Sequence, residues 1–545
     1  MSRVINFSLL LSMATCMAAT PAFAADSAST CASLNTLAVP SVTSIHAEEV
    51  TSGKFQPKTG AAFTELPHFC RVLVIASAAK GSHINIEMWI PSSGWNGKFL
   101  GTGNGGGAGK IYYPPLRSGL RRNFATANTD MGTTPGADKM VDNPEAWIDF
   151  GYRATHIMTT VGKAITQAYF GKPAQRSYFW GSSTGGQQAM SEAQRYPEDY
   201  DGIIAGSAAI NRTHLHSLFV WNYQAMHSAG DKSLLSDEEI KLLNRAVLHA
   251  CAGHDGGAPM DDFLTDPRSC RFDPATIPVC TTRQVTDCLT QPQLDALKKL
   301  YTGAVNPRTN ERIYAPMPPG SEASNLGLMY QQTPATAKQL LYPFLWTFGS
   351  SFDPMTFDFD KNEAALDDKL AAIANANNPD LTAFQRRGGK LILYTGTADP
   401  IVPYPDEISY YERVVSFMRT HPQHDAPADP LKATQSFFLL YVVPGMGHGA
   451  GGPGIDGFGQ LIQLTDNDVL YALEQWVEHG VVPGAFPGVG WNGGVSSGGV
   501  RLRRNVCAYP NFPSYAGGDA TQAASFPCTY HPRGEVPQAA ERYLR

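Results

Sequence analysis

Short apolar runs separated by glycine-containing turns dominate the chain from Cys70 onward. Four of them look like strands: RVLVIAS, INIEMWIP, GKFLGTG and NFATANTD. A helical spacing follows, because Ile157, Val161 and Ile165 fall on one face and Gly171 provides a stop. The next predicted strand, RSYFWG, enters a turn with two adjacent serines. The segment TGGQQAMSEAQRYP is a predicted helix leaving that turn, and YDGIIAGSAA is another predicted strand.

This alternation of strands and helices predicts an α/β fold with a mostly parallel sheet and helices on both faces. The alternation pauses from about residue 209 to 385, where the chain holds four cysteines, many prolines and aromatic clusters such as LYPFLWTFGSSFDPMTFDFD. It resumes with GGKLILYTGTADPIVPY and SFFLLYVVPGMGHGAGGPG. We therefore expect one core interrupted by an inserted lid subdomain.

The pattern divides the chain into four parts. They are a signal peptide (1–24), the first part of the core (25–208), the inserted lid (209–388) and the second part of the core with a C-terminal tail (389–545).

The predicted signal peptide begins with Arg3, continues with a short apolar stretch and ends in the cleavage pattern Ala22-Phe23-Ala24. The apolar stretch is too short for a membrane anchor. A lipoprotein signal at Cys16 would need a leucine three residues earlier, which is missing. We expect a secreted or periplasmic protein.

The composition narrows the choice of partners. Of 545 residues, 43% are hydrophobic and 17% charged, so the chain can bury a large core. The formal net charge of −6 indicates neither nucleic acid nor an anionic membrane surface as a partner. We expect a small-molecule substrate, and no membrane contact after signal removal.

Loss of Cys16 with the signal leaves eight of the nine cysteines. An even number in an exported chain indicates disulfides, although the sequence alone leaves many connectivities open. The sequence-local choice pairs neighbours. The pairs would be Cys31 with Cys70, Cys251 with Cys270, Cys280 with Cys288, and Cys507 with Cys528. Zinc is disfavoured because there is no C-x-x-C and the spacings are irregular.

The serine turn matches G-x-S-x-G at residues 181–185, with Ser183 in the centre. A nucleophile at a sharp strand-to-helix turn needs small residues on both sides, which Ser183 has and Ser182 lacks. A second match at residues 494–498 follows no predicted strand and opens no helix, so we interpret it as a surface loop. Ser183 is therefore the candidate nucleophile.

A serine nucleophile needs a base, and the base needs an orienting carboxylate. In α/β hydrolases the chain order is serine, acid, histidine. Asp399 and His448 each lie in a loop after a predicted strand and have this order. In isolation, an aspartate before proline is most often a turn former and a histidine among glycines is most often unremarkable. Three placements in the right order favour a catalytic triad.

An oxyanion hole is expected from the backbone N–H of Thr184 and from the glycine-rich segment GTGNGGGAG, at Gly105 and Gly106. Glycines there let the backbone approach a substrate oxygen. The alternative, a phosphate-binding loop, is disfavoured because the segment lacks the spacing to a following helix.

With these residues placed, the chain resembles the tannase and feruloyl esterase family. The matching segments are GNGGGAG, YFWGSSTGGQQAMSEAQRYPEDYDGIIAGSAA, MTFDFD, GTADPIVP and PGMGHGAGGPG, in the right order over much of the chain. The resemblance implies an α/β-hydrolase core with a lid, hydrolysis of aromatic acid esters, and a triad of Ser183, Asp399 and His448. The sequence-local cysteine pairing also resembles that of the family.

The chain departs from the family beside the triad. The family usually has one cysteine before the nucleophile and another after the histidine, joined by a disulfide. Here these positions are Ser182 and Gly449. Both are lost together, so packing alone must hold the nucleophile near its base.

The family often carries a structural calcium in the segment that here reads CAGHDGGAPMDDFLTDPRSC. The resemblance implies ligands from the side chains of Asp255 and Asp261 and the carbonyls near Gly257 and Phe263. The family's acidic residue after the first cysteine is Ala252 here, and the loop is longer. The alternative is a solvated acidic loop. Catalysis itself needs no cofactor.

The lid aromatics Phe344 and Trp346 could stack on an aromatic acid, or could belong to the lid core. We expect a secreted serine esterase that cleaves phenolic acid esters such as ferulates or gallates through an acyl-enzyme. The alternatives are a mono(hydroxyethyl) terephthalate-type or other ester or polyester hydrolase, a peptidase or lactonase on the same core, or a catalytically impaired binding homologue. A terephthalate monoester would need a cationic clamp, for which Lys338 and Arg308 are only nearby candidates.

Overall fold

The computed structural model describes residue 1 and residues 30–58, 60–283, 286–324, 340–420, 429–461, 467–530 and 536–544. The predicted signal peptide therefore lies almost wholly outside the described residues. Within them, no helix has both the length and the apolar character needed to cross a bilayer.

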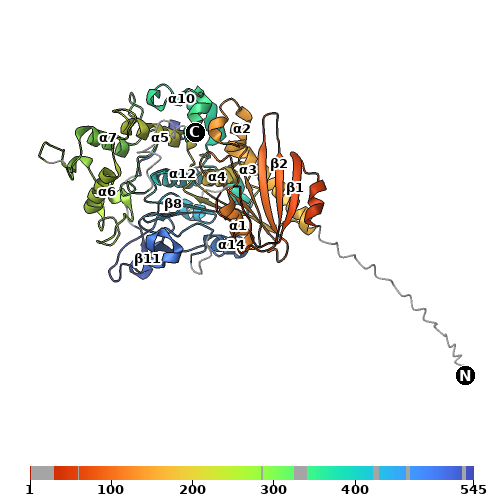
Figure 1. The fold of residues 1–545 in the computed structure, drawn as a ribbon. Helices are drawn as coiled ribbons and strands as arrows, with labels where there is room; N and C mark the ends of the chain where they lie inside the picture. The colour runs from red at the N-terminus through yellow and green to blue at the C-terminus, as the bar shows by residue number, and fades with distance from the viewer. Residues whose placement is uncertain are drawn as a thin grey trace.

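A nine-stranded sheet in the order β1-β2-β3-β5-β4-β6-β7-β8-β9 forms the centre of the protein (Figure 1). Strands β1, β2, β3 and β5 pair antiparallel, and β5, β4, β6, β7, β8 and β9 pair parallel. The strands are β1 (Val42–Val50), β2 (Phe69–Ala76), β3 (Ile84–Pro91), β4 (Lys98–Thr102), β5 (Ala125–Thr129), β6 (Arg176–Ser182), β7 (Gly202–Gly206), β8 (Lys390–Gly396) and β9 (Phe438–Val443).

Helices cover both faces of this sheet because its central strands are apolar on both sides. Phe99 and Leu100 of β4 are neighbours in sequence, but they belong to different buried clusters on opposite faces. The helices α3 (Ala154–Phe170), α4 (Thr184–Arg195) and α12 (Pro405–Thr420) contribute to the cluster with Phe99. On the other face, α14 (Val469–His479) contributes to the cluster with Leu100, and α1 (Tyr113–Arg121) contacts that leucine through Gly119.

The lid leaves the sheet after β7 and returns to it at β8, which pairs directly with β7. Most of its helices pack around a second buried cluster, which also includes Ala137, Trp147 and Phe150 from the first part of the core. Figure 1 shows α6 and α7 at the opposite end of the molecule from β1 and β2. The helices between these two strands are α5 (Arg212–Met226), α6 (Asp237–Cys251), α7 (Gln291–Thr302), α9 (Tyr342–Phe348), α10 (Glu363–Ala374) and α11 (Thr382–Arg386).

The C-terminal tail holds a hairpin of β10 (Phe486–Trp491) and β11 (Val500–Val506), then the short strands β12 (Phe512–Pro513) and β13 (Cys528–Thr529). The second G-x-S-x-G match lies in an exposed turn of this hairpin, as expected of a surface loop. The shorter helices α2 (Pro144–Ile148) and α13 (Pro430–Gln435) precede α3 and β9.

Four disulfides join the predicted pairs: Cys31–Cys70, Cys251–Cys270, Cys280–Cys288 and Cys507–Cys528. The sequence-local pairing is thus confirmed for all eight cysteines. Each bridge closes within one segment of the chain, and one of them anchors the tail.

Candidate active site

Ser183 lies at the junction between β6 and α4, with φ 63° and ψ −120°. Residues other than glycine adopt these backbone angles only with conformational strain. Such a strained backbone is characteristic of a nucleophile at a strand-to-helix turn. The flanking glycines are required by space. A Cβ at Gly181 would overlap the backbone of Gly185, and a Cβ at Gly185 would lie 3.0 Å from backbone atoms of Asn104.

His448 and Asp399 follow the ends of β9 and β8, and both approach Ser183. His448 Nε2 lies 2.8 Å from Ser183 Oγ, and its Nδ1 lies 2.9 Å from Asp399 Oδ2. Asp399 is fully buried, and its Oδ1 accepts the backbone N–H groups of Ile401 and Val402, each at 2.9 Å. In neutral His448, Nδ1–H therefore donates to Asp399, which leaves Nε2 free to accept the Ser183 hydroxyl proton.

Two opposed effects set the pKa of His448. Burial lowers the pKa of the imidazole, while the charge of Asp399 and its hydrogen bond raise it, and the net pKa lies above the usual value. Asp399 therefore stabilises the imidazolium that would form when His448 takes a proton from Ser183.

The glycine-rich loop after β4 is attached to the start of α4. Asn104 N–H donates to Gln188 Oε1 at 2.9 Å, and Gly185 N–H donates to the Asn104 carbonyl at 2.7 Å. The Thr184 hydroxyl donates to the Gly106 carbonyl at 2.7 Å. Gly105 is exposed, and an added Cβ there would meet no atom within 4 Å. The predicted oxyanion residues are thus brought together next to Ser183.

A cavity of about 400 Å³ opens in front of Ser183. Its described lining consists of Gly103, Asn104, Gly105, Ala108, Lys110, Tyr112, Trp180, Ser182, Ser183, His448, Gly449, Ala450 and Gln460. Sequence reasoning missed Lys110, Tyr112, Trp180 and Gln460. The first two lie just after the glycine-rich loop, and Trp180 lies in β6 shortly before Ser183, so their nearness in sequence was the available signal.

The prediction that Phe344 and Trp346 bind substrate is corrected by their burial. Both are at most 2% exposed and belong to the lid cluster, and neither lines the cavity at Ser183. Phe344 stacks on Phe352 with ring centroids 5.1 Å apart, and Trp346 Nε1 donates to the Ala137 carbonyl at 2.8 Å. Their apolar surface is used inside the lid.

The two candidates for a cationic clamp are not in this cavity either. Arg308 is exposed and forms an ion pair with Asp360 at 2.9 Å, and it is not among the described lining residues. Lys338 lies outside the described residues.

Ser182 and Gly449, the positions of the missing cysteine pair, are in contact. A Cβ built on Gly449 would lie 3.5 Å from Ser182 Cβ. The Gly449 N–H donates to Ser207 Oγ at 3.0 Å, so a hydrogen bond to a serine side chain just after β7 helps to hold the histidine loop without a disulfide.

The loop between Cys251 and Cys270 does not fit the predicted calcium site. Calcium takes roughly six to eight oxygen ligands, several of them carboxylates, and the loop brings together only Asp255 and Asp261. Asp255 accepts the Gly257 N–H at 3.0 Å and the Thr265 and Asp266 N–H groups.

Asp261 already has a cationic partner. Its Oδ1 lies 2.6 Å from Nη2 of Arg504, and both side chains are at most 7% exposed. The guanidinium also lies 5.6 Å from the centroid of the Phe263 ring. The charge of this loop is thus balanced by an arginine from β11, 243 residues away. The predicted metal roles of the Asp255 and Asp261 side chains do not fit these contacts, and those of the Gly257 and Phe263 carbonyls stay predictions.

Within the described parts of the chain, only His156, Glu192 and Asp199 bring three possible metal-ligand atoms within 4.8 Å of one another. His156 Nδ1 is bound to Asp199 Oδ2 at 2.6 Å, and burial and then Asp199 raise the pKa of Glu192 well above its usual value. Burial and the neighbouring Asp199 carboxyl therefore favour the protonated form of Glu192 over a carboxylate that could bind a metal.

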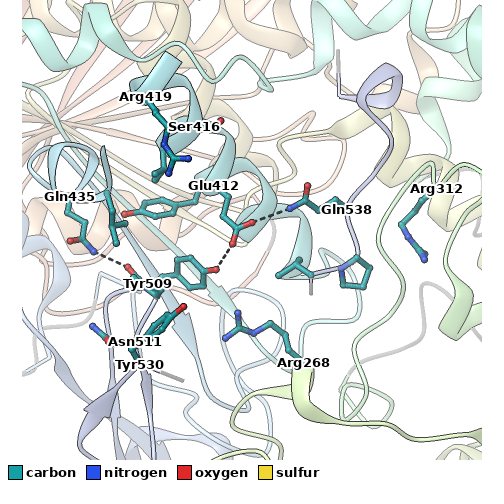
Figure 2. A pocket seen from close by; sticks show the side chains of 16 residues that line it. Arg268, Arg312, Glu412, Ser416, Arg419, Gln435, Tyr509, Asn511, Tyr530 and Gln538 are labelled. Atoms are coloured by element: carbon teal, nitrogen blue, oxygen red, sulfur yellow. Dashed lines mark hydrogen bonds between the residues drawn. The ribbon is translucent and has the colours of Figure 1, made fainter. Parts of the chain in front are cut away.

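A larger cavity of about 1440 Å³ lies between α12, the lid loop and the C-terminal segment (Figure 2). Glu412 accepts hydrogen bonds there from the Tyr509 hydroxyl at 2.6 Å and from Gln538 Nε2 at 3.1 Å. Its described lining includes no histidine. Serine chemistry is therefore expected in the smaller cavity.

A mostly parallel sheet with helices on both faces, whose strand ends bring together a serine, a histidine and an aspartate, is an α/β-hydrolase core. The family model described as "Tannase and feruloyl esterase" matches residues 70–529, and the chain belongs to this family.

Relatives of known name agree with this assignment. An uncharacterized esterase of Xanthomonas campestris pv. campestris is 36% identical over 95% of this chain and 94% of its own length. Feruloyl esterase B of Aspergillus niger is 30% identical over 84% of this chain and 86% of its own. The solved structure of feruloyl esterase B from Aspergillus oryzae has a TM-score of 0.80 at 27% identity, covering 92% of this chain and 99% of its own. The protein is a carboxylic ester hydrolase of the feruloyl esterase and tannase type.

Proposed function

We propose that this enzyme cleaves esters of phenolic acids by a serine mechanism in which Ser183, His448 and Asp399 form the triad. The observation that carries the proposal is the continuous hydrogen-bond chain from Ser183 Oγ through the His448 ring to Asp399. Such a chain lets the imidazole take the serine proton while the buried carboxylate holds the ring.

In this mechanism, Ser183 Oγ attacks the ester carbonyl carbon as His448 Nε2 takes the hydroxyl proton. The carbonyl oxygen becomes an oxyanion, for which the N–H groups of Thr184 and Gly105 are the proposed donors. Collapse of this intermediate breaks the ester C–O bond, and the alcohol leaves with the proton from His448. A water molecule, deprotonated by His448, then attacks the acyl-enzyme and releases the acid.

The cavity supports a small aromatic acyl group. Its volume of about 400 Å³ lies within the ordinary range for small-molecule sites, and Tyr112 and Trp180 supply aromatic surface. The feruloyl esterase B relatives support a phenolic acid over the terephthalate monoester. The intact hydrogen-bond chain also argues against an impaired binding homologue.

We further infer that the protein is secreted or periplasmic. Four disulfides favour an oxidising compartment, and the N-terminal sequence has the pattern of a signal peptide.

The test is hydrolysis by the purified mature protein, with Ser183→Ala as the control. The panel contains methyl ferulate, methyl gallate, chlorogenate, mono(hydroxyethyl) terephthalate and nitrophenyl acetate. We expect Ser183-dependent turnover of one phenolic ester well above that of nitrophenyl acetate. Turnover that survives Ser183→Ala would exclude the proposed nucleophile, and turnover of nitrophenyl acetate alone would exclude phenolic specificity.

A further inference from the structure

Lys110 is a cationic side chain that lines the cavity at Ser183. It is exposed, and none of the ion pairs found among the described residues involves it. Apart from His448, it is the only charged residue in the described lining of that cavity. Among the described residues, a substrate held there thus meets one ammonium group that forms no ion pair with a carboxylate.

The backbone of Lys110 is fixed relative to the candidate oxyanion loop. Asn104 Nδ2 donates to the Lys110 carbonyl at 3.0 Å, and the Tyr112 N–H donates to Asn128 Oδ1 at 2.8 Å. Asn104 is itself bonded through its N–H to Gln188 of α4. The ammonium therefore extends from a backbone position that is tied to the same helix as the nucleophile.

A second cavity, of about 590 Å³, adjoins the first across Lys110 and Tyr112, which line both. The segment around Lys58 and Phe63 forms another part of its wall. An ester that extends from Ser183 past Lys110 and Tyr112 would reach this second cavity.

The charge in the second cavity is also positive. Lys58 and Lys110 both line it, and the only acidic residue in its described lining is Asp130. The Asp130 carboxylate is 1% exposed. It already accepts hydrogen bonds from the Asn85 and Gly132 N–H groups, from Asn85 Nδ2 and from the Thr134 hydroxyl. Its hydrogen bonds hold this carboxylate in place but leave its charge, so the described lining carries two lysines against one acid.

We propose that Lys110 determines substrate specificity by binding a carboxylate located at a distance from the scissile ester bond. The second cavity accommodates this anionic end of the substrate. The inference rests on the proposed serine esterase function and narrows its substrate class to anionic aromatic esters. Carboxylate and ammonium form a charge-assisted hydrogen bond, which is stronger than a neutral one.

The carboxylate can belong to the alcohol or to the acid, and two matched pairs of esters distinguish these sources. Chlorogenate and its methyl ester share the caffeoyl group and the ring of the alcohol, but only chlorogenate has a free carboxylate on the alcohol. Mono(hydroxyethyl) terephthalate and its methyl ester share the alcohol, but only the former has a free carboxylate on the acid.

We expect the anionic member of one pair to be preferred, and Lys110→Met to lower its kcat/KM about 10-fold. The neutral member should stay within about 2-fold, and Lys110→Arg should restore the preference because it keeps the charge. Lys432→Met is the matched control, because this exposed lysine lines neither cavity.

Binding to the Ser183→Ala protein, measured by calorimetry with the same four esters, separates recognition from chemistry. Weaker binding of the anionic ester after adding Lys110→Met supports the proposal even if turnover is low. The proposal is overturned if neither pair shows a charge preference, or if Lys110→Met weakens both members equally. Loss of the serine mechanism alone would instead appear as turnover that Ser183→Ala does not abolish.

Discussion

Burial disfavours the charged form of His448 and so lowers its pKa. The Asp399 carboxylate raises this pKa by a larger amount, so the net pKa lies above the usual value. The base must be neutral to accept the serine proton, so kcat/KM should be constant above the raised pKa and fall about tenfold per pH unit below it.

Asp399→Asn removes the charge that raises this pKa. The acidic limb of the pH profile should therefore move to lower pH, while the plateau falls roughly 10³–10⁴-fold because the ring loses its orienting acceptor. The measurement is kcat/KM against pH for one neutral ester with both proteins. An unmoved limb would show that Asp399 does not set the pKa of His448.

The contact between Ser182 and Gly449 leads to a second prediction. With a Cβ at both positions, the separation of 3.5 Å is at the short end of the range found in disulfides. The double variant Ser182→Cys with Gly449→Cys should form a bridge, at a strain cost of about 1–2 kcal/mol because residue 449 has φ +67°.

Titration of free thiols under denaturing conditions, before and after reduction, measures this bridge. The wild-type protein and the two single variants are the controls. If two free thiols are found in the double variant before reduction, the placement of the histidine loop against the end of β6 is contradicted.

At the scale of elements, a buried ion pair between Arg504 and Asp261 attaches β11 to the loop between Cys251 and Cys270. Removing one partner of such a pair leaves an uncompensated charge, which costs about 3–5 kcal/mol. Arg504→Met should therefore lower the unfolding temperature clearly. Arg501→Met on the same strand removes a partly exposed pair with Asp262 and hydrogen bonds to the Pro453 and Gly454 carbonyls. It should cost less than Arg504→Met because it leaves no buried charge unpaired.

The same unfolding experiment, repeated with a chelator and with added calcium, tests whether the loop between Cys251 and Cys270 binds a metal ion. Arg504 rather than a metal balances the loop, so we expect the wild-type unfolding temperature to be unchanged by either addition. A drop of several degrees on chelation would show that the loop holds a cation after all.

The sequence predicted most of the sheet and the site because both depend on local patterns. The nucleophile could be placed because β6, the turn at Ser183 and α4 are consecutive in the sequence. Asp399 and His448 could be placed because each lies in the loop directly after a predicted strand. It did not predict the partner of Asp261, because Arg504 is distant in sequence and the pairing depends on how the tail folds back. It also could not separate core aromatics from substrate-binding ones, because Phe344 is equally apolar in either role. The strands β1 and β10 to β13 were missed. The last four lie in the tail, whose many glycines indicated a loop-rich segment.

At the scale of the whole molecule, the disulfides differ in how much chain they close. Cys31–Cys70 spans 39 residues and joins the N-terminal segment to β2, whereas Cys280–Cys288 spans 8 within the lid. From the loop-closure entropy that each bridge removes from the unfolded chain, the first should stabilise the fold by about 4 kcal/mol and the second by roughly 2.5 kcal/mol. Replacing Cys31 and Cys70 by alanine should therefore lower the unfolding temperature more than replacing Cys280 and Cys288. Scans at one heating rate test this order, and the reverse order would contradict it.

Each of the eight paired cysteines is bonded to its immediate neighbour among them. Once the predicted signal peptide with Cys16 is removed, a chain that emerges N-terminus first and is oxidised as it emerges meets each correct partner before any other unpaired cysteine. Native pairing then requires a thiol oxidant, but no isomerase to undo mistakes. The order of synthesis is itself enough to guide oxidative maturation of this enzyme.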